Sequence, residues 1–430
     1  MSSEEAGAMS EENTQKSALV PRLRFPEFRE AGEWEEKSIG DSCESFSGGT
    51  PSTINKDFYG GDIPFIRSAE IDKNKTELFL TIEGLNNSAA KMVKVGDILI
   101  ALYGANSGDV ALARINGAIN QAILCLRHET NNIFVYQYLS IKKEWIITTF
   151  LQGGQGNLSG DIIKGIKLFF PLPDEQQKIA DCLSSLDELI AAEANKLDAL
   201  KTHKKGLMQQ LFPAEGETLP RLRFPEFREA GEWESKPLGK VCAVLQGYGF
   251  PEALQGRNHG KYPFCKVSDV SRAVAENGGL LTTAVNYVDE DDLSTLKAKC
   301  VPMGATVFAK IGEALRLNRR AFVQKECLID NNVVGLKAIY GIADDHFVYI
   351  LSQLIDLNKH CGGAVPSVNK STLEAIEVII PAPPEQKRIA DCLAALDDLI
   401  AAQTQKIELL KRFKKGLMQQ LFPVLDEAPA

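Results

Sequence analysis

The chain has 430 residues, of which 44% are hydrophobic and 24% charged, as in a folded globular protein of two or three domains. Its formal net charge of −9 argues against a protein that coats nucleic acid by charge alone. No apolar run approaches the roughly 20 residues of a membrane-spanning helix, and the acidic first residues are unlike a secretory signal. The nine cysteines are scattered and never spaced Cys-x-x-Cys, so we expect a cytoplasmic protein without a disulfide framework or zinc site.

The chain contains two copies of one unit. After an acidic tail at 1–20, which we expect to be disordered, the segment PRLRFPEFREAGEWE stands at 21–35 and returns unchanged at 220–234. The strings EQQKIADCLSSLDELIAA from Glu175 and EQKRIADCLAALDDLIAA from Glu385 form a second repeated pair, and KKGLMQQLFP closes both copies. Each copy is therefore an opening segment, a variable block and a long helix, which predicts a duplicated domain with an internal pseudo-twofold.

The variable blocks are predicted to be α+β. Short apolar runs at 97–103 and 122–127 in the first block, and at 306–311 and 377–380 in the second, are typical of strands bounded by Gly, Asn and Pro. One helix is predicted late in each block, at 133–150 and 344–360. Segments 153–171 and 363–381 align at an offset of 210 residues, so the blocks share a frame while their loops differ.

Two long helices are predicted at 174–213 and 384–423, each ended by proline. Both carry a heptad pattern of apolar residues over five heptads, which is typical of a coiled coil. We expect the helices to pair antiparallel with each other; the alternative is that each packs on a partner protein. Glu193 and Gln403 interrupt the pattern, marking either an opening toward a partner or a solvated surface. The expected interface residues are Ile179, Leu183, Leu186, Ile190, Leu197, Leu200, Leu207, Leu211, Ile389, Leu393, Leu396, Ile400, Ile407, Leu410, Leu417 and Leu421.

No catalytic constellation is recognisable in the sequence. It has no Walker A string, no Asn-Pro-Pro-aromatic string and no His-Glu-x-x-His, and its five histidines do not cluster. The neighbouring pair His360 and Cys361 is more typical of a structural role than of a metal site. The sequence therefore predicts no catalytic and no metal-binding residue, and it favours a binding protein with two sites over an enzyme.

Several longer motifs together resemble the specificity subunit of type I restriction–modification systems. They are LRFPEF at Leu23–Phe28 and Leu222–Phe227, SGGTPSTINKDFYGGDIPFIRSAEI at Ser47–Ile71, VGDILIALYGANSG at Val95–Gly108, the helix starts LPDEQQKIADCL and PPEQKRIADCL, and KKGLMQQLF in both copies. The resemblance covers nearly all of the chain beyond residue 20. The second block departs from it, because QGYGF at 246–250 replaces the Gly-Gly-Thr-Pro segment and 308–317 replaces the second long motif.

The resemblance implies two α/β target recognition domains, at 21–173 and 236–383, separated by spacer helices at 174–213 and 384–423 that form an antiparallel coiled coil. Residues 214–235 are then a linker with the repeated opening segment, and 424–430 a tail. Each recognition domain would read one half of a split, asymmetric sequence in double-stranded DNA. The implied partners are two methyltransferase subunits and, in the full complex, restriction subunits; S-adenosylmethionine, ATP and Mg²⁺ belong to those partners, and this chain is expected to hold no cofactor.

Base readout requires Arg or Lys for guanine and Asn or Gln for adenine, projected from loops into the major groove. The alternative role of each candidate is an ordinary solvated side chain, and for Tyr59 and Tyr103 equally a core aromatic residue. The candidates are Lys56, Tyr59, Arg67, Ser68, Tyr103, Asn106, Ser107, Gln121 and Gln155 in the first block, and Gln246, Tyr248, Lys266, Arg272, Lys310, Arg316, Arg319 and Arg320 in the second. Alternative functions are a coiled-coil scaffold that joins proteins without touching DNA, and a stand-alone nuclease or methyltransferase.

Overall fold

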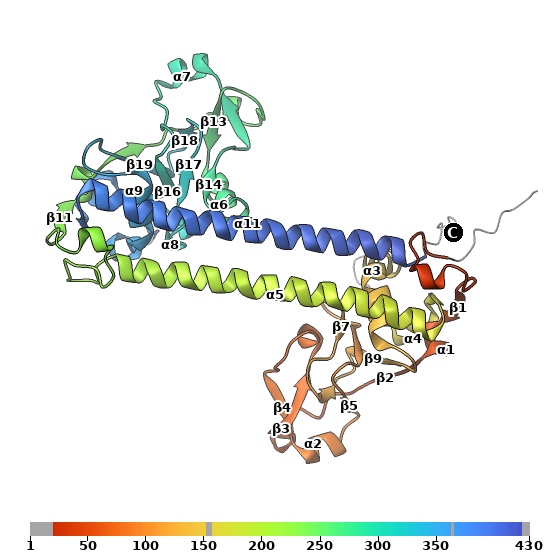
Figure 1. Ribbon diagram of the computed structural model, residues 1–430. Coiled ribbons are helices and arrows are strands. Elements are labelled where there is room, and N and C mark those ends of the chain that lie inside the picture. Colours follow the sequence, from red (N-terminus) through yellow and green to blue (C-terminus); the bar gives the residue numbers. More distant parts are fainter. Residues whose placement is uncertain (1–19, 152–156, 363–364, 424–430) are drawn as a thin grey trace, which may run out of the picture. The chain divides into compact units, whose positions relative to one another are not determined.

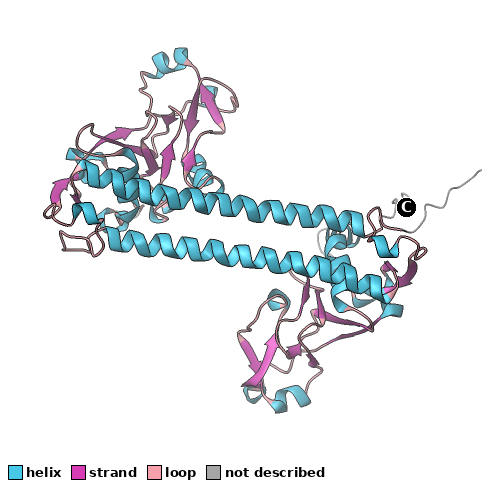
Figure 2. Ribbon diagram, viewed as in Figure 1, coloured by secondary structure: helices cyan, strands magenta, loops and turns pink. Residues whose placement is uncertain are grey.

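The computed structural model describes residues 20–151, 157–362 and 365–423. The expected terminal tails, apart from Val20, and Gln155 therefore lie outside the described residues. The chain divides into two compact units: the first is Met1–Ala192 with Ile407–Ala430, and the second is Glu193–Lys406. Each unit thus combines one variable block with part of both long helices, and Figure 2 shows strands and helices in both.

The first unit holds two small sheets and a strand pair, in the orders β2-β9-β6-β7, β4-β3-β8-β5 and β1-β10. Its strands are β1 (Glu35–Ser38), β2 (Cys43–Ser47), β3 (Tyr59–Ile66), β4 (Leu78–Leu80), β5 (Lys91–Val93), β6 (Ile98–Ala101), β7 (Val110–Leu112), β8 (Gly117–Ile119), β9 (Ile123–His128) and β10 (Lys167–Phe170). Its shorter helices are α1 (Ile39–Ser42), α2 (Ile82–Asn86), α3 (Asn132–Phe150) and α4 (Gly160–Gly165).

The second unit repeats this plan with sheets in the orders β12-β19-β16-β17-β14 and β15-β13-β18 and a pair β11-β20. Its strands are β11 (Glu234–Pro237), β12 (Cys242–Gln246), β13 (Tyr262–Cys265), β14 (Leu280–Leu281), β15 (Asn286–Val288), β16 (Thr306–Ala309), β17 (Ala321–Val323), β18 (Leu328–Ile329), β19 (Val333–Ala338) and β20 (Glu377–Ile380). Its shorter helices are α6 (Val267–Glu276), α7 (Glu290–Leu296), α8 (Glu313–Arg316), α9 (Asp345–Leu354) and α10 (Lys370–Glu374).

The long helices are α5 (Pro173–Leu211) and α11 (Pro383–Leu421), each opening on a proline whose fixed φ suits a first helical turn (Figure 1). In the first unit the start of α5 packs on the end of α11, because Leu183 and Leu421 lie in one buried cluster. In the second unit the end of α5 packs on the start of α11, with Leu211 and Leu393 in one cluster. The helices are therefore antiparallel in each unit, and all the expected interface residues are buried or half-buried.

Polar residues inside the helix seam pair across it. Lys414 Nζ lies 2.6 Å from Asp187 Oδ1 in the first unit, and in the second unit Lys204 Nζ lies 2.5 Å from Asp397 Oδ1. The two ion pairs occupy the same positions of the repeat, 210 residues apart. Such polar layers are satisfied in only one register and one direction of the helices. They therefore favour antiparallel over parallel pairing.

Glu193 and Gln403 are not an opening toward a partner and are not merely solvated. Gln403 is buried, and its amide donates to Glu193 Oε2 at 2.6 Å and to the Glu193 carbonyl oxygen at 2.9 Å. Lys406 also pairs with this carboxylate. A third polar layer of the seam is therefore satisfied by the two helices themselves.

The repeated opening segments are explained by their contacts with the helices. Trp34 packs on Phe134 and Phe422 in the first unit, and Trp233 packs on Phe347 and Phe212 in the second. The backbone N–H of Leu23 donates to Gln420 O at 2.9 Å, as that of Leu222 does to Gln210 O at 2.9 Å. Each opening segment is thus part of the core that joins a block to the helices.

A buried ion pair fixes each opening segment to the first turns of a long helix. The Arg24 guanidinium binds both carboxylate oxygens of Glu175, at 2.8 and 2.7 Å, and Arg223 binds Glu385 in the same way, at 2.7 and 2.7 Å. The side chains are 8% and 1% exposed in the first pair and 10% and 2% in the second. Within each unit, the opening segment is thereby fixed to the start of a long helix.

The expected fold class is confirmed: the chain is α+β, with two similar blocks alternating with long helices that pair antiparallel in each unit. The strands expected at 122–127, 306–311 and 377–380 appear as β9, β16 and β20, and the helix expected at 133–150 as α3. The helix expected at 344–360 is shorter, because α9 ends at Leu354 and Asp356 then caps a separate 3₁₀ turn. Within the described residues no helix has the length and apolar character needed to cross a bilayer.

Candidate nucleic-acid interface

The candidate DNA contacts of the first block lie on the loops that join its two sheets. Gln121 is exposed between β8 and β9, and its Oε1 accepts a hydrogen bond from Thr50 Oγ1 at 2.7 Å. Arg67 and Ser68 follow the end of β3, the strand that pairs parallel with β8 through Ile66 and Ile119. The structure therefore brings Arg67, Ser68 and Gln121 to one end of adjacent strands.

The remaining candidates of this block are more dispersed. Lys56 is exposed and Tyr59 half-buried at the start of β3, where the Tyr59 hydroxyl donates to Pro51 O at 2.8 Å. Tyr103 is exposed after β6, and Ser107 Oγ donates to Leu102 O, which ties down its loop. Asn106 borders a hollow of about 330 Å³ next to Lys143 and Asp109, which form an ion pair at 2.5 Å.

The guanidinium of Arg67 is held by two carboxylates. It lies 3.0 Å from Glu70 Oε2 and 2.7 Å from Glu77 Oε2, and these hydrogen bonds raise the Arg67 pKa. Burial opposes ionisation of Glu70, but hydrogen bonds from Arg67, from backbone N–H groups and from Thr76 outweigh it and lower the Glu70 pKa to about 2. Arg67 is thus a fixed, charged donor whose free edge is set by its acidic neighbours.

The second block gathers its candidates on the corresponding loops. Lys310 follows β16, and its ammonium donates to Gln246 Oε1 at 3.1 Å. Lys266 follows β13; its ammonium donates to Gln255 Oε1 at 3.0 Å and lies 4.9 Å from the ring centroid of Phe250. The hydrogen-bond partners of both lysines are amide oxygens, and the Lys266 charge also interacts with the nearby Asp330 carboxylate.

Other candidates of the second block are paired or partly buried. Arg272 binds Asp269 at 2.5 Å within α6, and Arg316 is exposed on α8 at 3.3 Å from Glu313. Tyr248 is half-buried and its hydroxyl accepts the Lys299 N–H at 2.9 Å. Arg319 is half-buried in the loop after α8.

Arg320 is the candidate that the structure argues against. It is 4% exposed, its guanidinium stacks 4.2 Å from the Phe308 ring centroid, and it donates to Ser352 O and Asn318 Oδ1. Burial lowers its pKa to about 9. A side chain enclosed in this way holds its own loop in place, so we remove Arg320 from the proposed contact set.

Two residues that sequence reasoning missed belong beside the candidates. Thr50 orients Gln121, as described above. Asn331 is exposed between β18 and β19, where Gln121 stands between β8 and β9. The offset of 210 residues that aligns segments 153–171 and 363–381 also aligns Gln121 with Asn331, so the repeat itself contained the indication.

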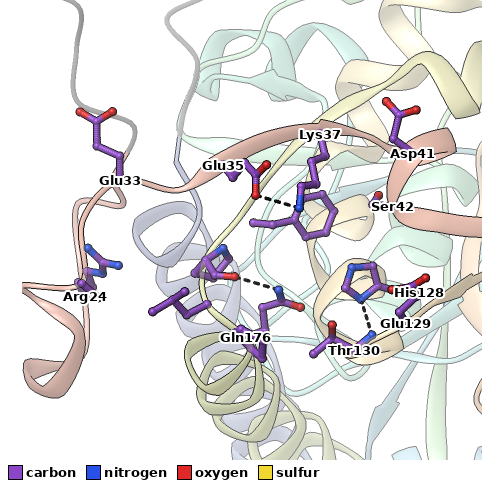
Figure 3. A pocket seen from close by; sticks show the side chains of 15 residues that line it. Arg24, Glu33, Glu35, Lys37, Asp41, Ser42, His128, Glu129, Thr130 and Gln176 are labelled. Atoms are coloured by element: carbon purple, nitrogen blue, oxygen red, sulfur yellow. Dashed lines mark hydrogen bonds and ion pairs between the residues drawn. The ribbon is translucent and has the colours of Figure 1, made fainter.

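A separate cavity of about 540 Å³ lies at the junction of the opening segment, β1 and the start of α5 in the first unit (Figure 3). None of the candidate DNA contacts lines it. Burial lowers the pKa of His128, whose Nδ1 accepts the backbone N–H groups of Thr130 and Asn131. Gln176 Oε1 is buried there with no hydrogen-bond partner among the described residues, whereas Oε1 of the equivalent Gln386 accepts the Asp344 N–H at 3.1 Å.

Within the described ranges no group of three or more His, Cys, Asp or Glu side chains converges as metal ligands. The site is therefore characterised by loops with amide and cationic side chains, in two versions built on one frame.

Comparison with known proteins agrees with this arrangement. The model of the family described as type I restriction modification DNA specificity domain matches residues 31–202 and again 230–412. The chain is 24% identical over 410 residues to the type I restriction enzyme MjaIX specificity subunit of Methanocaldococcus jannaschii, covering 90% of this chain and 92% of that protein. It is 24% identical over 423 residues to the MjaVIII specificity subunit of the same organism, covering 93% of each.

Among solved structures, the S subunit of a type I restriction-modification system from M. genitalium has a TM-score of 0.58 at 15% identity, covering 95% of this chain and 100% of that one. The likeness in structure concerns the fold, and the two matches of the family model concern descent. The chain therefore belongs to the type I restriction modification DNA specificity family, and it carries the family's domain twice.

Proposed function

We propose that the chain is the DNA sequence-specificity subunit of a type I restriction–modification complex and reads a split, asymmetric duplex target with one half-site per block. The observation that carries this is the occurrence of one fold unit twice with different loops, for example 48–51 after β2 and 247–251 after β12. Two different readers recognise two different half-sites. We assign them to recognition domains at 21–173 and 236–383.

The long helices set the unread gap between the half-sites. Each helix contributes residues to both units, and in each unit the seam is closed by apolar side chains and by an ion pair. A paired, stiff spacer suits a ruler, because a single long helix in water is only marginally stable without packing.

The chemistry of methylation and cleavage belongs to partners, and this chain is a non-catalytic subunit. We propose two methyltransferase subunits and, in the full complex, restriction subunits as partners in the cytoplasm, and these supply the sites for S-adenosylmethionine, ATP and Mg²⁺. The recognition domains carry 16 basic against 18 acidic residues at 21–173, and 16 against 15 at 236–383. Such neutral blocks bind phosphates weakly, so the partners also supply most of the clamping charge.

The proposal is tested by sequencing the methylated bases of a host with and without the gene. Loss of methylation at one split motif supports it, and an unchanged methylation pattern in the deletion strain refutes it. An unchanged methylation pattern would instead favour the alternative of a coiled-coil scaffold without DNA recognition. Purified chain is also incubated with DNA, methyl donor, ATP and Mg²⁺; turnover by this chain alone would contradict the non-catalytic role.

A further inference from the structure

The loops of the two blocks can be matched residue by residue, although their sequences differ. In the first block β3 pairs parallel with β8, Ile66 opposite Ile119; in the second β13 pairs parallel with β18, Cys265 opposite Ile329. The strand pair β2–β9 corresponds in the same way to β12–β19. Ser47 pairs with Leu124 in the first block, and Gln246 with Val334 in the second. The residues that follow β8 and β18 are therefore equivalent.

The turn that follows these strands is built in the same way in both blocks. Asn120 Oδ1 accepts the Ala122 N–H at 3.0 Å, and Asp330 Oδ1 accepts the Asn332 N–H at 3.0 Å. This side-chain-to-backbone bond forms an Asx turn, which fixes the backbone around its middle residue. The middle residues are Gln121 and Asn331, which are both exposed carboxamides.

A neighbouring glycine shows that the backbone is packed closely at both turns. A Cβ added to Gly48 would lie 1.8 Å from Ile119 O, and one added to Gly247 would lie 1.8 Å from Asp330 O. Neither position can accept a side chain without moving the turn. Each carboxamide therefore stands on a turn that packs directly against the neighbouring backbone, and specific recognition needs such support.

In each block a cation follows the strand that pairs parallel with the strand before the carboxamide. Arg67 follows Ile66 and Lys266 follows Cys265, and the backbone N–H of each donates to a helix-capping acid, Glu70 or Asp269, at 3.2 and 2.8 Å. Arg67 is held by carboxylates, whereas the Lys266 ammonium donates to the Gln255 amide oxygen, lies over the Phe250 ring and interacts electrostatically with the Asp330 carboxylate. Both blocks thus pair an amide with a cation, the side chains that read adenine and guanine.

We propose that Asn331 is a specificity-determining residue of the second block, which reads an adenine in the second half-site from the position that Gln121 holds in the first. This inference rests on the proposed DNA-recognition function. A bidentate amide–adenine contact discriminates against the wrong base by about 5- to 150-fold. Loss of that contact relaxes one position of one half-site and leaves the rest of the target unchanged.

The experiment uses the complex of the full chain with its modification subunits and duplexes that carry each of the four bases at every position of the methylated motif. For N331A we expect the preference for adenine at one position of the second half-site to fall to about onefold, with the first half-site and gap unchanged. Q121A is the matched variant and relaxes one position of the first half-site instead. N86A removes an exposed carboxamide from α2 and leaves every preference as in the unaltered chain.

N331D adds a positive readout, because a carboxylate accepts from cytosine N4 and shifts the preferred base from adenine to cytosine. Unchanged preferences in both N331A and N331D, or relaxation within the first half-site, would overturn the assignment. If the unaltered complex shows no preference for any split motif, the proposed function fails, which is a different result from failure of Asn331. Since Asn331 is exposed, unaltered thermal unfolding of N331A checks that the fold is kept.

Discussion

The pair Arg223–Glu385 provides the sharpest test of how the opening segments are held. Glu385 is 2% exposed on its side chain and receives two hydrogen bonds from Arg223, which also donates to Gly231 O at 2.6 Å. In R223M the carboxylate stays buried without its cation. Removing one partner of a buried pair costs about 3–5 kcal/mol, a large share of a domain's stability.

The double variant R223M/E385L separates burial from attraction. It removes both charges and replaces them by apolar groups of similar size, so we expect its stability to return to within about 1 kcal/mol of the unaltered chain. With the single variant E385L completing the double-mutant cycle, the coupling energy is then at least about 2 kcal/mol. As a control, K387M breaks an ion pair with Asp391 whose side chains are 67% and 54% exposed, and it changes stability by less than about 1 kcal/mol.

Urea unfolding followed by tryptophan fluorescence measures these differences. Trp233 lies in the second unit, whereas Trp34 and Trp145 lie in the first, so W34F/W145F leaves a probe of the second unit alone. Refutation would be a loss of less than about 1 kcal/mol in R223M, or a double variant no more stable than R223M. Arg24, probed by Trp34, should reproduce the effect in the first unit.

Three further predictions use equivalent positions of the repeat or a single titratable side chain. Gln386 makes three side-chain hydrogen bonds and Gln176 makes one, so Q386L should lower the unfolding free energy by about 3 kcal/mol and Q176L by about 1; equal losses would contradict this. D397K should lower the unfolding free energy of the second unit by about 1 kcal/mol, and adding K204D should restore it, as measured by chemical denaturation. No change in D397K would show that the pair does not contribute to stability. The lowered pKa of half-buried His128 means that the unfolded chain protonates first as pH falls through about 6.5. Stability of the first unit should therefore decrease below that pH, and H128Q should flatten this part of the profile in unfolding measured at each pH.

The frame of the molecule could be predicted because repetition and period are visible in the sequence. The identical opening segments, the heptads and the bounding prolines all indicate long paired helices. The contact partners could not be predicted, because they join residues far apart in the chain. Arg24 and Glu175 lie 151 residues apart, and nothing in either string shows that one binds the other.

The candidate surface was predicted by residue type, and type alone misjudges burial. Arg320 belongs to the most basic stretch of the second block, yet its environment is set by Phe308 and by a carbonyl 32 residues away. Conversely, Asn331 stands in an unremarkable polar run, and its interest comes from register. The repeat offset aligns it with Gln121, but which neighbours it has becomes visible only in the paired strands.

The identical opening segments and the equivalent ion pairs of the two long helices have a consequence for how such a gene can change. Recombination between the stretches that encode 21–35 and 220–234 would delete one copy and leave a chain with one block and one helix. That helix still carries both Asp397 and Lys414, the equivalents of Asp187 and Lys204. Two such half-length chains would pair antiparallel through this helix with both ion pairs intact, giving a homodimer whose DNA target is a palindrome.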